Sequence, residues 1–220
     1  MSKSSRTGII VKSLALSLIG VGTSQAALID RGGGLIYDDV KNLTWLQDAN
    51  LAVTGGYDAD GRLSWADALA FAQNLEYRDE ARGVVWTDWR LPTAVNDPTS
   101  AGYDPTGANS ELGYMYYVNL GLTPIYIAGN KGPIKNDWFS NLTGNAYWTG
   151  TGVKTDRTAW GFQFGYGSLE VGGVGNTIRA WLVRDGDVGA PPRGVPEPGT
   201  LALLAMGLAG VGLSRRRKKA

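Results

Sequence analysis

Residues 88–93 read Asp88-Trp89-Arg90-Leu91-Pro92-Thr93. This stretch predicts where a strand ends and which of its side chains face the core. A proline holds the residue before it in an extended conformation and offers no N–H to a sheet, so Pro92 should end a strand. Because side chains alternate along a strand, Trp89 and Leu91 point to one face and Arg90 points to the other. An aromatic side chain beside a proline usually packs. We therefore interpret the stretch as structural.

Arg90 then needs an acidic partner, since a guanidinium packed against the domain is normally paired with a carboxylate. Glu111 and Asp185 are the two candidates. We expect Trp89, Arg90, Leu91, Pro92 and Glu111 to hold the fold rather than to contact a ligand.

Two segments have the pattern of short amphipathic helices. Ser64 and Asp67 form a start that resembles a capping box, and apolar residues spaced by three and four follow it, which predicts a helix over Ser64–Leu75. A second helix is predicted over Ser110–Leu120 on the same spacing argument.

Strands are predicted where short apolar pieces are bounded by glycines. They are Leu35–Tyr37, Leu43–Leu46, Ala146–Thr149, Ala159–Phe164 and Ile178–Arg184. Glycine accounts for 32 of 220 residues, about twice its usual share, which favours many turns and few long helices. Two short helices among many short antiparallel strands indicate an α+β fold, in a single domain over residues 27–187.

These motifs together resemble the Lcl C-terminal domain family. The resemblance rests on Asp88–Thr93 with Glu111-Leu112, on Leu43–Leu46, on Trp65–Ala68, on Ala146–Thr149 and on Ala180–Arg184, which occur in the family's order. It implies a domain related to C-type-lectin-like folds. Many members carry cysteines, whereas this chain has none, so no disulfide can be transferred from them.

The N-terminus has the three parts of a secretory signal peptide. Lys3, Arg6 and Lys12 precede an apolar run at Leu14–Val21, and Ser24 and Ala26 supply the small residues needed for cleavage before Ala27. An ordinary N-terminal helix is the alternative interpretation. We expect residues 1–26 to be a signal peptide that signal peptidase removes.

The C-terminus consists of a spacer, an apolar segment and a basic cluster, in that order. A spacer rich in proline and glycine, residues 188–197, leads into an uncharged segment, residues 198–214, that predicts a short membrane helix. A basic cluster follows and should remain cytoplasmic. A plain membrane anchor is one interpretation. However, residues 195–219 resemble the PEP-CTERM sorting signal, whose elements here are Val195, Pro196, Glu197, Pro198, Arg215, Arg216 and Arg217.

The resemblance to PEP-CTERM proteins implies a route out of the cell. In that family an exosortase, a membrane protease or transpeptidase, recognises the tail and processes it near Pro-Glu-Pro. We therefore expect export from a Gram-negative bacterium, transient anchoring in the inner membrane, and a final place at the cell surface or outside it.

Composition excludes several classes of chemistry. The chain has no cysteine and no histidine, which excludes disulfides, thiol nucleophiles, and any imidazole base or metal ligand. Without the eight basic residues of the two ends, 13 basic residues face 19 acidic ones between Asp30 and Arg193, a formal charge of −6. An acidic surface repels phosphate backbones, so we expect no nucleic-acid partner.

Calcium is the one cofactor that the sequence suggests. Asp58, Asp60 and Asp67 match later positions of a calcium-binding loop of the EF-hand type, with Gly61 at the turn, but Gly56 stands where the first ligand should be. The alternative is a polar turn that leads into the helix at Ser64, with Asp67 capping it.

Sugar binding is suggested by aromatic residues in loop-like sequence. Tryptophan rings stack on sugar faces, and neighbouring amides and carboxylates bond to hydroxyls, so the candidate ligand-binding residues are Asn136, Asp137, Trp138 and Trp148. The alternative is that most tryptophans form the core. The calcium-dependent sugar motifs of C-type lectins are absent.

We expect no enzyme, because no pair of carboxylates has a spacing that predicts catalysis. The sequence favours an exported, non-catalytic adhesion module that binds extracellular polysaccharide. A structural matrix protein without a defined ligand is the first alternative, and a carboxylate-dependent glycoside hydrolase is the second.

Overall fold

The computed structural model describes residues 28–124, 132–153 and 157–189. Its strands are β1 (Leu28–Asp30), β2 (Leu35–Asp38), β3 (Leu43–Leu46), β4 (Tyr77–Asp79), β5 (Val84–Trp86), β6 (Gly102–Tyr103), β7 (Ala146–Val153), β8 (Thr158–Gln163), β9 (Ser168–Gly173) and β10 (Val183–Asp185). Its helices are α1 (Leu51–Thr54), α2 (Trp65–Asn74) and α3 (Glu111–Tyr114), with a 3-10 turn at Pro98–Ser100 and a π-helical turn at Met115–Asn119. Short helices among antiparallel strands agree with the predicted α+β class.

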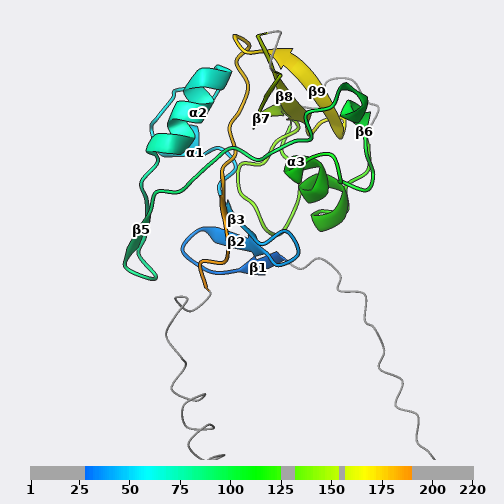
Figure 1. The fold of residues 1–220 in the computed structure, drawn as a ribbon. Helices are drawn as coiled ribbons and strands as arrows, with labels where there is room; N and C mark the ends of the chain where they lie inside the picture. Colours follow the sequence, from blue (N-terminus) through cyan, green and yellow to red (C-terminus); the bar gives the residue numbers. More distant parts are fainter. Residues whose placement is uncertain (1–27, 125–131, 154–156, 190–220) are drawn as a thin grey trace, which may run out of the picture.

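Two four-stranded antiparallel sheets organise the domain. The first has the order β1-β2-β3-β10, so the two ends of the described domain meet in one sheet. The second has the order β6-β9-β8-β7. Figure 1 shows the first sheet at the bottom of the view and the second at the top, with α1 and α2 beside it and the β4–β5 hairpin extending to the left.

The helix predicted over Ser64–Leu75 is α2, and its start is the predicted cap. The Ser64 hydroxyl accepts a hydrogen bond from the Asp67 backbone N–H at 3.2 Å and donates one to the Asp67 carboxylate at 2.6 Å. The first bond satisfies a free backbone N–H of the first helical turn, and the second holds the two side chains together. The buried face of α2 consists of Ala68, Phe71 and Ala72.

The segment predicted as a helix over Ser110–Leu120 is helical, but its winding changes halfway. The Ser110 hydroxyl caps α3 by accepting from the Gly113 N–H at 2.8 Å. After Tyr114 the turns widen, and the Leu120 N–H bonds to the Met115 carbonyl at 2.9 Å, five residues back. A wider turn of this kind shifts which side chains face inward, and here it keeps both Met115 and Tyr116 buried.

The prediction of a strand over Ile178–Arg184 is wrong for most of its length, whereas the other four predicted strands are confirmed within a few residues. Only Val183–Asp185 forms a strand. The preceding residues make isolated bridges, Ile178 with Leu63 and Arg179 with Tyr147. The reason is that this segment crosses from the upper sheet to the lower one (Figure 1, yellow to orange) and so has no single neighbour along its length.

The core between the sheets is aromatic. Trp181, which is 1% exposed, lies within 4.6 Å of Trp45 and 4.7 Å of Phe139, measured between ring centroids. Phe164 and Tyr147 lie against the same ring at 6.0 and 6.2 Å. Tilted and edge-on contacts at these distances suit the ring quadrupoles. The tryptophans of a glycine-rich chain therefore supply much of its buried volume.

The predicted signal peptide, residues 1–26, and the predicted sorting helix, residues 198–214, lie outside the described residues. Within the described ranges, no helix is both long and apolar enough to cross a membrane.

Candidate functional site

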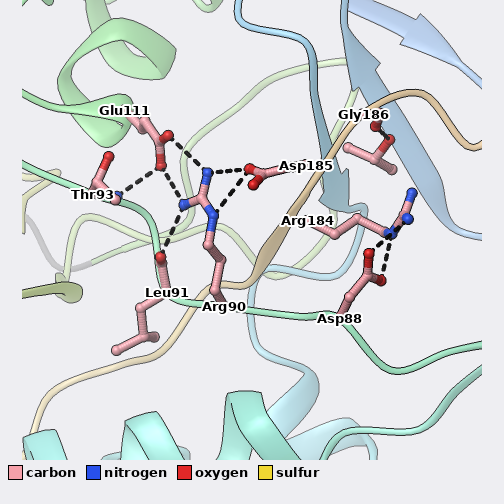
Figure 2. A network of polar contacts seen from close by, with 9 residues as sticks. Asp88, Arg90, Leu91, Thr93, Glu111, Arg184, Asp185 and Gly186 are labelled. Carbon is pink, nitrogen blue, oxygen red and sulfur yellow. Dashed lines mark hydrogen bonds and ion pairs between the residues drawn. The ribbon is translucent and has the colours of Figure 1, made fainter.

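The motif at residues 88–93 lies at the centre of a network of ion pairs and hydrogen bonds (Figure 2). Arg90 donates two parallel hydrogen bonds to Glu111, of 2.8 and 3.0 Å, and two to one oxygen of Asp185, of 3.1 and 2.6 Å. Figure 2 shows the guanidinium between the two carboxylates. Both predicted partners of Arg90 are thus its actual partners. Trp89 and Leu91 are buried, at 3% and 2% exposure, as the alternation predicts.

A further ion pair joins Asp88, two residues before Arg90, to Arg184, one residue before Asp185. Arg184 donates to both oxygens of Asp88, at 2.8 Å each (Figure 2). Arg90 and Val183 exchange backbone hydrogen bonds of 2.8 and 2.9 Å between the two segments. Asp88 and Arg90 therefore face Arg184 and Asp185 across an antiparallel bridge, with the charges reversed between the two sides.

Electrostatics in this cluster follow from these contacts. Burial alone would lower the pKa of Arg90, but the hydrogen bonds and charges of Glu111 and Asp185 outweigh it and raise that pKa. The hydrogen bonds from Arg184 lower the pKa of Asp88. Each charged side chain of the cluster has an oppositely charged protein partner. The cluster can therefore tie segments together, and it offers no free acid or base.

Two further carboxylates are fully buried and are equally engaged. Asp79 accepts hydrogen bonds from the Arg82 guanidinium at 2.7 Å and from the Trp86 indole at 3.2 Å. Asp38 accepts from the backbone of Val40 and Lys41, at 3.1 and 2.9 Å. Buried carboxylates that accept this many hydrogen bonds from nearby residues hold the local chain in its turn conformation.

The structure does not bring the predicted calcium ligands together. Asp58 accepts from the backbone N–H groups of Asp60 and Gly61 at 3.0 and 2.7 Å, and these backbone bonds lower its pKa. Asp67 is occupied by the cap at Ser64. Among the described residues, no group of three or more acidic side chains is placed to hold a metal ion. The segment is the polar turn that was the alternative interpretation, and its residues do not fit calcium.

The predicted sugar-binding residues are only partly accessible. Trp148 is 1% exposed and its indole N–H bonds to the Leu63 carbonyl at 2.9 Å, so little of its ring is open to solvent. Asn136 uses its side-chain oxygen to accept from the backbone of Trp138 and Phe139, at 2.9 and 2.6 Å. Trp138 is half-buried against the core, and Asp137 is exposed.

Sequence reasoning missed a polar hollow on the second sheet. One part, of about 140 Å³, is lined by Arg62, Asn145, Ala146, Gln163, Ile178 and Arg179. An adjoining part, of about 150 Å³, is lined by Ala146, Trp148, Gly161, Gln163, Glu170, Val171, Gly172, Asn176 and Ile178. The shared residues make the two parts neighbours. The signal that could have revealed it is a small residue on each of three strands, Ala146, Gly161 and Gly172.

Alternation along the strands explains why this face is hollow. Tyr147 of β7 and Phe162 of β8 pack into the aromatic core, so Ala146 and Gly161 turn to the opposite face. Alanine and glycine leave space there, and longer polar side chains surround it.

A second, wider hollow of about 460 Å³ lies beside α1 and α2, with Tyr57, Phe71, Glu76 and Arg78 among its lining residues. Its cation is already engaged, since Arg78 forms an ion pair with Glu80 at 2.5 Å. Its remaining charged group is the carboxylate of Glu76, so it offers no unpaired cation to an acidic ligand.

Comparison with known families agrees with the motifs described above. The family model of the Lcl C-terminal domain matches residues 34–184, well over half of the chain. The model of the PEP-CTERM protein-sorting motif matches residues 194–218 and includes all seven predicted sorting residues. No curated protein and no solved structure matches the chain. The sorting motif marks the chain for export to the cell surface and for processing by an exosortase. The chain belongs to the Lcl C-terminal domain family and carries a PEP-CTERM sorting motif.

Proposed function

We propose that this exported protein acts at the surface or in the matrix of a Gram-negative cell, as a non-catalytic module that binds extracellular polysaccharide. Its sorting motif supports delivery to the place where such polymers lie. A signal peptide at residues 1–26 and a membrane helix at residues 198–214 belong to the same proposal.

The observation that carries the proposal is the polar hollow over β7, β8 and β9. Two side-chain amides, those of Asn145 and Gln163, line it together with two guanidinium groups. Amides both donate and accept hydrogen bonds, as sugar hydroxyls do. Such a lining suits a polyhydroxylated ligand better than an apolar one.

The hydrogen-bond partners of the carboxylates support a function without catalysis. Glycoside hydrolysis needs two carboxyl groups that flank a bond, one of them able to give up a proton. Asp38, Asp79 and Glu111 are instead engaged with backbone N–H groups or arginines. Glu170 is the one carboxylate that lines the hollow, so a hydrolase of this type would lack its second acid there.

We also infer that the domain is a relative of C-type lectins. The support is its family, together with the pairing of β10 with the sheet of β1, β2 and β3. Because Asp58, Asp60 and Asp67 are not gathered into a metal site, the proposed sugar binding is independent of calcium.

The test is a glycan array probed with the protein that its host exports, with and without a calcium chelator. We expect retention of a subset of polysaccharides, unchanged by the chelator. Retention of none would favour a structural matrix protein without a ligand. Release of reducing sugar from any retained polymer would favour a hydrolase.

A further inference from the structure

Arg179 is an arginine whose charge is not matched within the described part of the chain. Its Nε and Nη1 atoms are buried and have no hydrogen-bond partner. By contrast, Arg31, Arg78, Arg82, Arg90 and Arg184 each form an ion pair with a carboxylate. Burying guanidinium N–H groups without a hydrogen-bond partner is costly to the folded state. Such a group is therefore a candidate for binding something from outside.

The backbone holds Arg179 firmly in place. Its N–H bonds to the Ala146 carbonyl at 3.0 Å, and its carbonyl accepts from the Trp148 N–H at 2.9 Å. Next to it, Leu63 and Ile178 exchange two backbone hydrogen bonds, of 2.8 and 3.1 Å. This bridge sets Arg62 beside the same hollow. Two guanidinium groups from distant segments thus line one space of about 140 Å³.

The rest of the hollow has a different character. Its adjoining part, of about 150 Å³, contains Glu170 and Asn176 and no cation. Glu170 accepts from the Ser168 hydroxyl at 2.7 Å and retains further acceptor capacity. A ligand that matches both parts carries an anionic group at one end and hydroxyl groups at the other.

The size of the hollow and its glycine floor suit a sugar ring. A cavity of about 150 Å³ accepts a six-membered ring such as benzene. A Cβ on Gly172 would meet Asn176 at 3.4 Å and Trp148 at 3.6 Å, which are ordinary contacts, and its φ is not positive. Neither backbone conformation nor packing requires glycine at this position. Its effect is to keep the hollow open.

We propose that this hollow binds an acidic sugar, a hexuronate unit of an extracellular polysaccharide, with the carboxylate at Arg179 and Arg62 and the hydroxyls at Gln163, Glu170 and Asn176. This rests on the proposed polysaccharide binding and names its ligand class. Two arginines offer several N–H donors to one carboxylate, and such charge-assisted bonds are stronger than neutral ones. Because Arg62 and Arg179 place two positive charges at this hollow, the site can bind an acidic ligand although the domain as a whole is acidic.

The experiment is calorimetric titration of the exported, processed protein with trigalacturonate and, separately, with neutral maltotriose. We expect the unaltered protein to prefer trigalacturonate by at least about tenfold, since the charged contacts have no counterpart in the neutral sugar. Arg179→Met should abolish that preference. Gly172→Val should fill the hollow and weaken binding of trigalacturonate by a similar factor.

A readout of stability separates a binding role from a structural one. Because the side-chain Nε and Nη1 atoms of Arg179 have no hydrogen-bond partner, Arg179→Met should leave the melting temperature unchanged or raise it. Arg78→Met is the matched control, since Arg78 is exposed and lies outside this hollow, and it should retain full binding.

The outcomes that would contradict the proposal can be told apart from one another. Trigalacturonate binding that survives both Arg179→Met and Gly172→Val overturns the site. A preference for maltotriose overturns the acidic ligand but leaves polysaccharide binding intact. Binding of neither sugar, together with no retention on the glycan array, overturns both proposals.

Discussion

Arg90 and Glu111, 21 residues apart, are joined by two parallel hydrogen bonds, of 2.8 and 3.0 Å. Glu111 also accepts from the Thr93 N–H through its side chain at 2.7 Å, and its own N–H bonds to the Thr93 carbonyl at 3.0 Å. Asp185 of β10 completes the cluster from the other side. One arginine thereby fastens the segment at residues 90–93 to the start of α3 and to the last strand.

Glu111→Gln should destabilise the domain by about 2 kcal/mol, because it leaves the half-buried guanidinium of Arg90 without its bidentate partner. Urea unfolding followed by tryptophan fluorescence measures the change. Asp185→Asn is the control, since the Asp185 side chain is 77% exposed, and exposed ion pairs contribute less than about 1 kcal/mol. Equal losses in the two variants would contradict a dominant role for Glu111.

Acid should destabilise the domain through Asp79. Burial alone would raise the pKa of Asp79, but the hydrogen bonds from Arg82 and Trp86 outweigh it, so the folded-state pKa lies below its ordinary value. A lowered folded-state pKa contributes stability above the unfolded-state value, about 3.9, and this contribution is lost as the pH falls through the folded-state pKa. The melting temperature should therefore drop below about pH 4.

Asp79→Asn tests whether the charged form of Asp79 stabilises the folded state. The variant should be less stable than the unaltered protein at pH 7, by about 2 kcal/mol, and the difference should shrink at pH 3. The absence of histidine means that stability should change little between about pH 5.5 and 8. A difference that is the same at pH 3 and pH 7 would show that the charge of Asp79 does not matter.

Gly107→Ala should destabilise the domain by about 2 kcal/mol or more. Gly107 has a φ of +66°, and a Cβ there would come within 2.5 Å of the Tyr114 backbone. Gly175→Ala is the matched control, because its φ is not positive and nothing lies within 4 Å of the added Cβ. Thermal unfolding of the pair measures the difference, and a stable Gly107→Ala variant would contradict this close approach to α3.

Processing at the C-terminus should depend on the sorting motif. Replacing Pro196 and Glu197 with alanine should leave the tail attached and the chain in the membrane fraction. Mass spectrometry of the C-terminus measures this. The control replaces Pro191 and Pro192, which lie before the matched range of residues 194–218, and this variant should be processed normally. Normal processing of the Pro196 and Glu197 variant would contradict recognition at Pro-Glu-Pro.

Local pattern carried much of the fold because it depends on neighbours in the chain. Ser64 and Asp67 predicted the start of α2, since a cap is made within one turn. The strand at Leu43–Leu46 was predicted with its observed bounds. Prediction was wrong over most of Ile178–Arg184, where the partners change from one sheet to the other.

By itself, the sequence determined the sorting tail, the α+β class, and the two acids that Arg90 would seek, because each of these is read from residue type and short-range order. The tertiary structure alone decided that Asp58, Asp60 and Asp67 do not meet and that Arg62 and Arg179 do line one hollow. The physical reason is that side chains from distant segments come together through backbone bridges such as Leu63 with Ile178. Such bridges leave no periodic mark in the sequence.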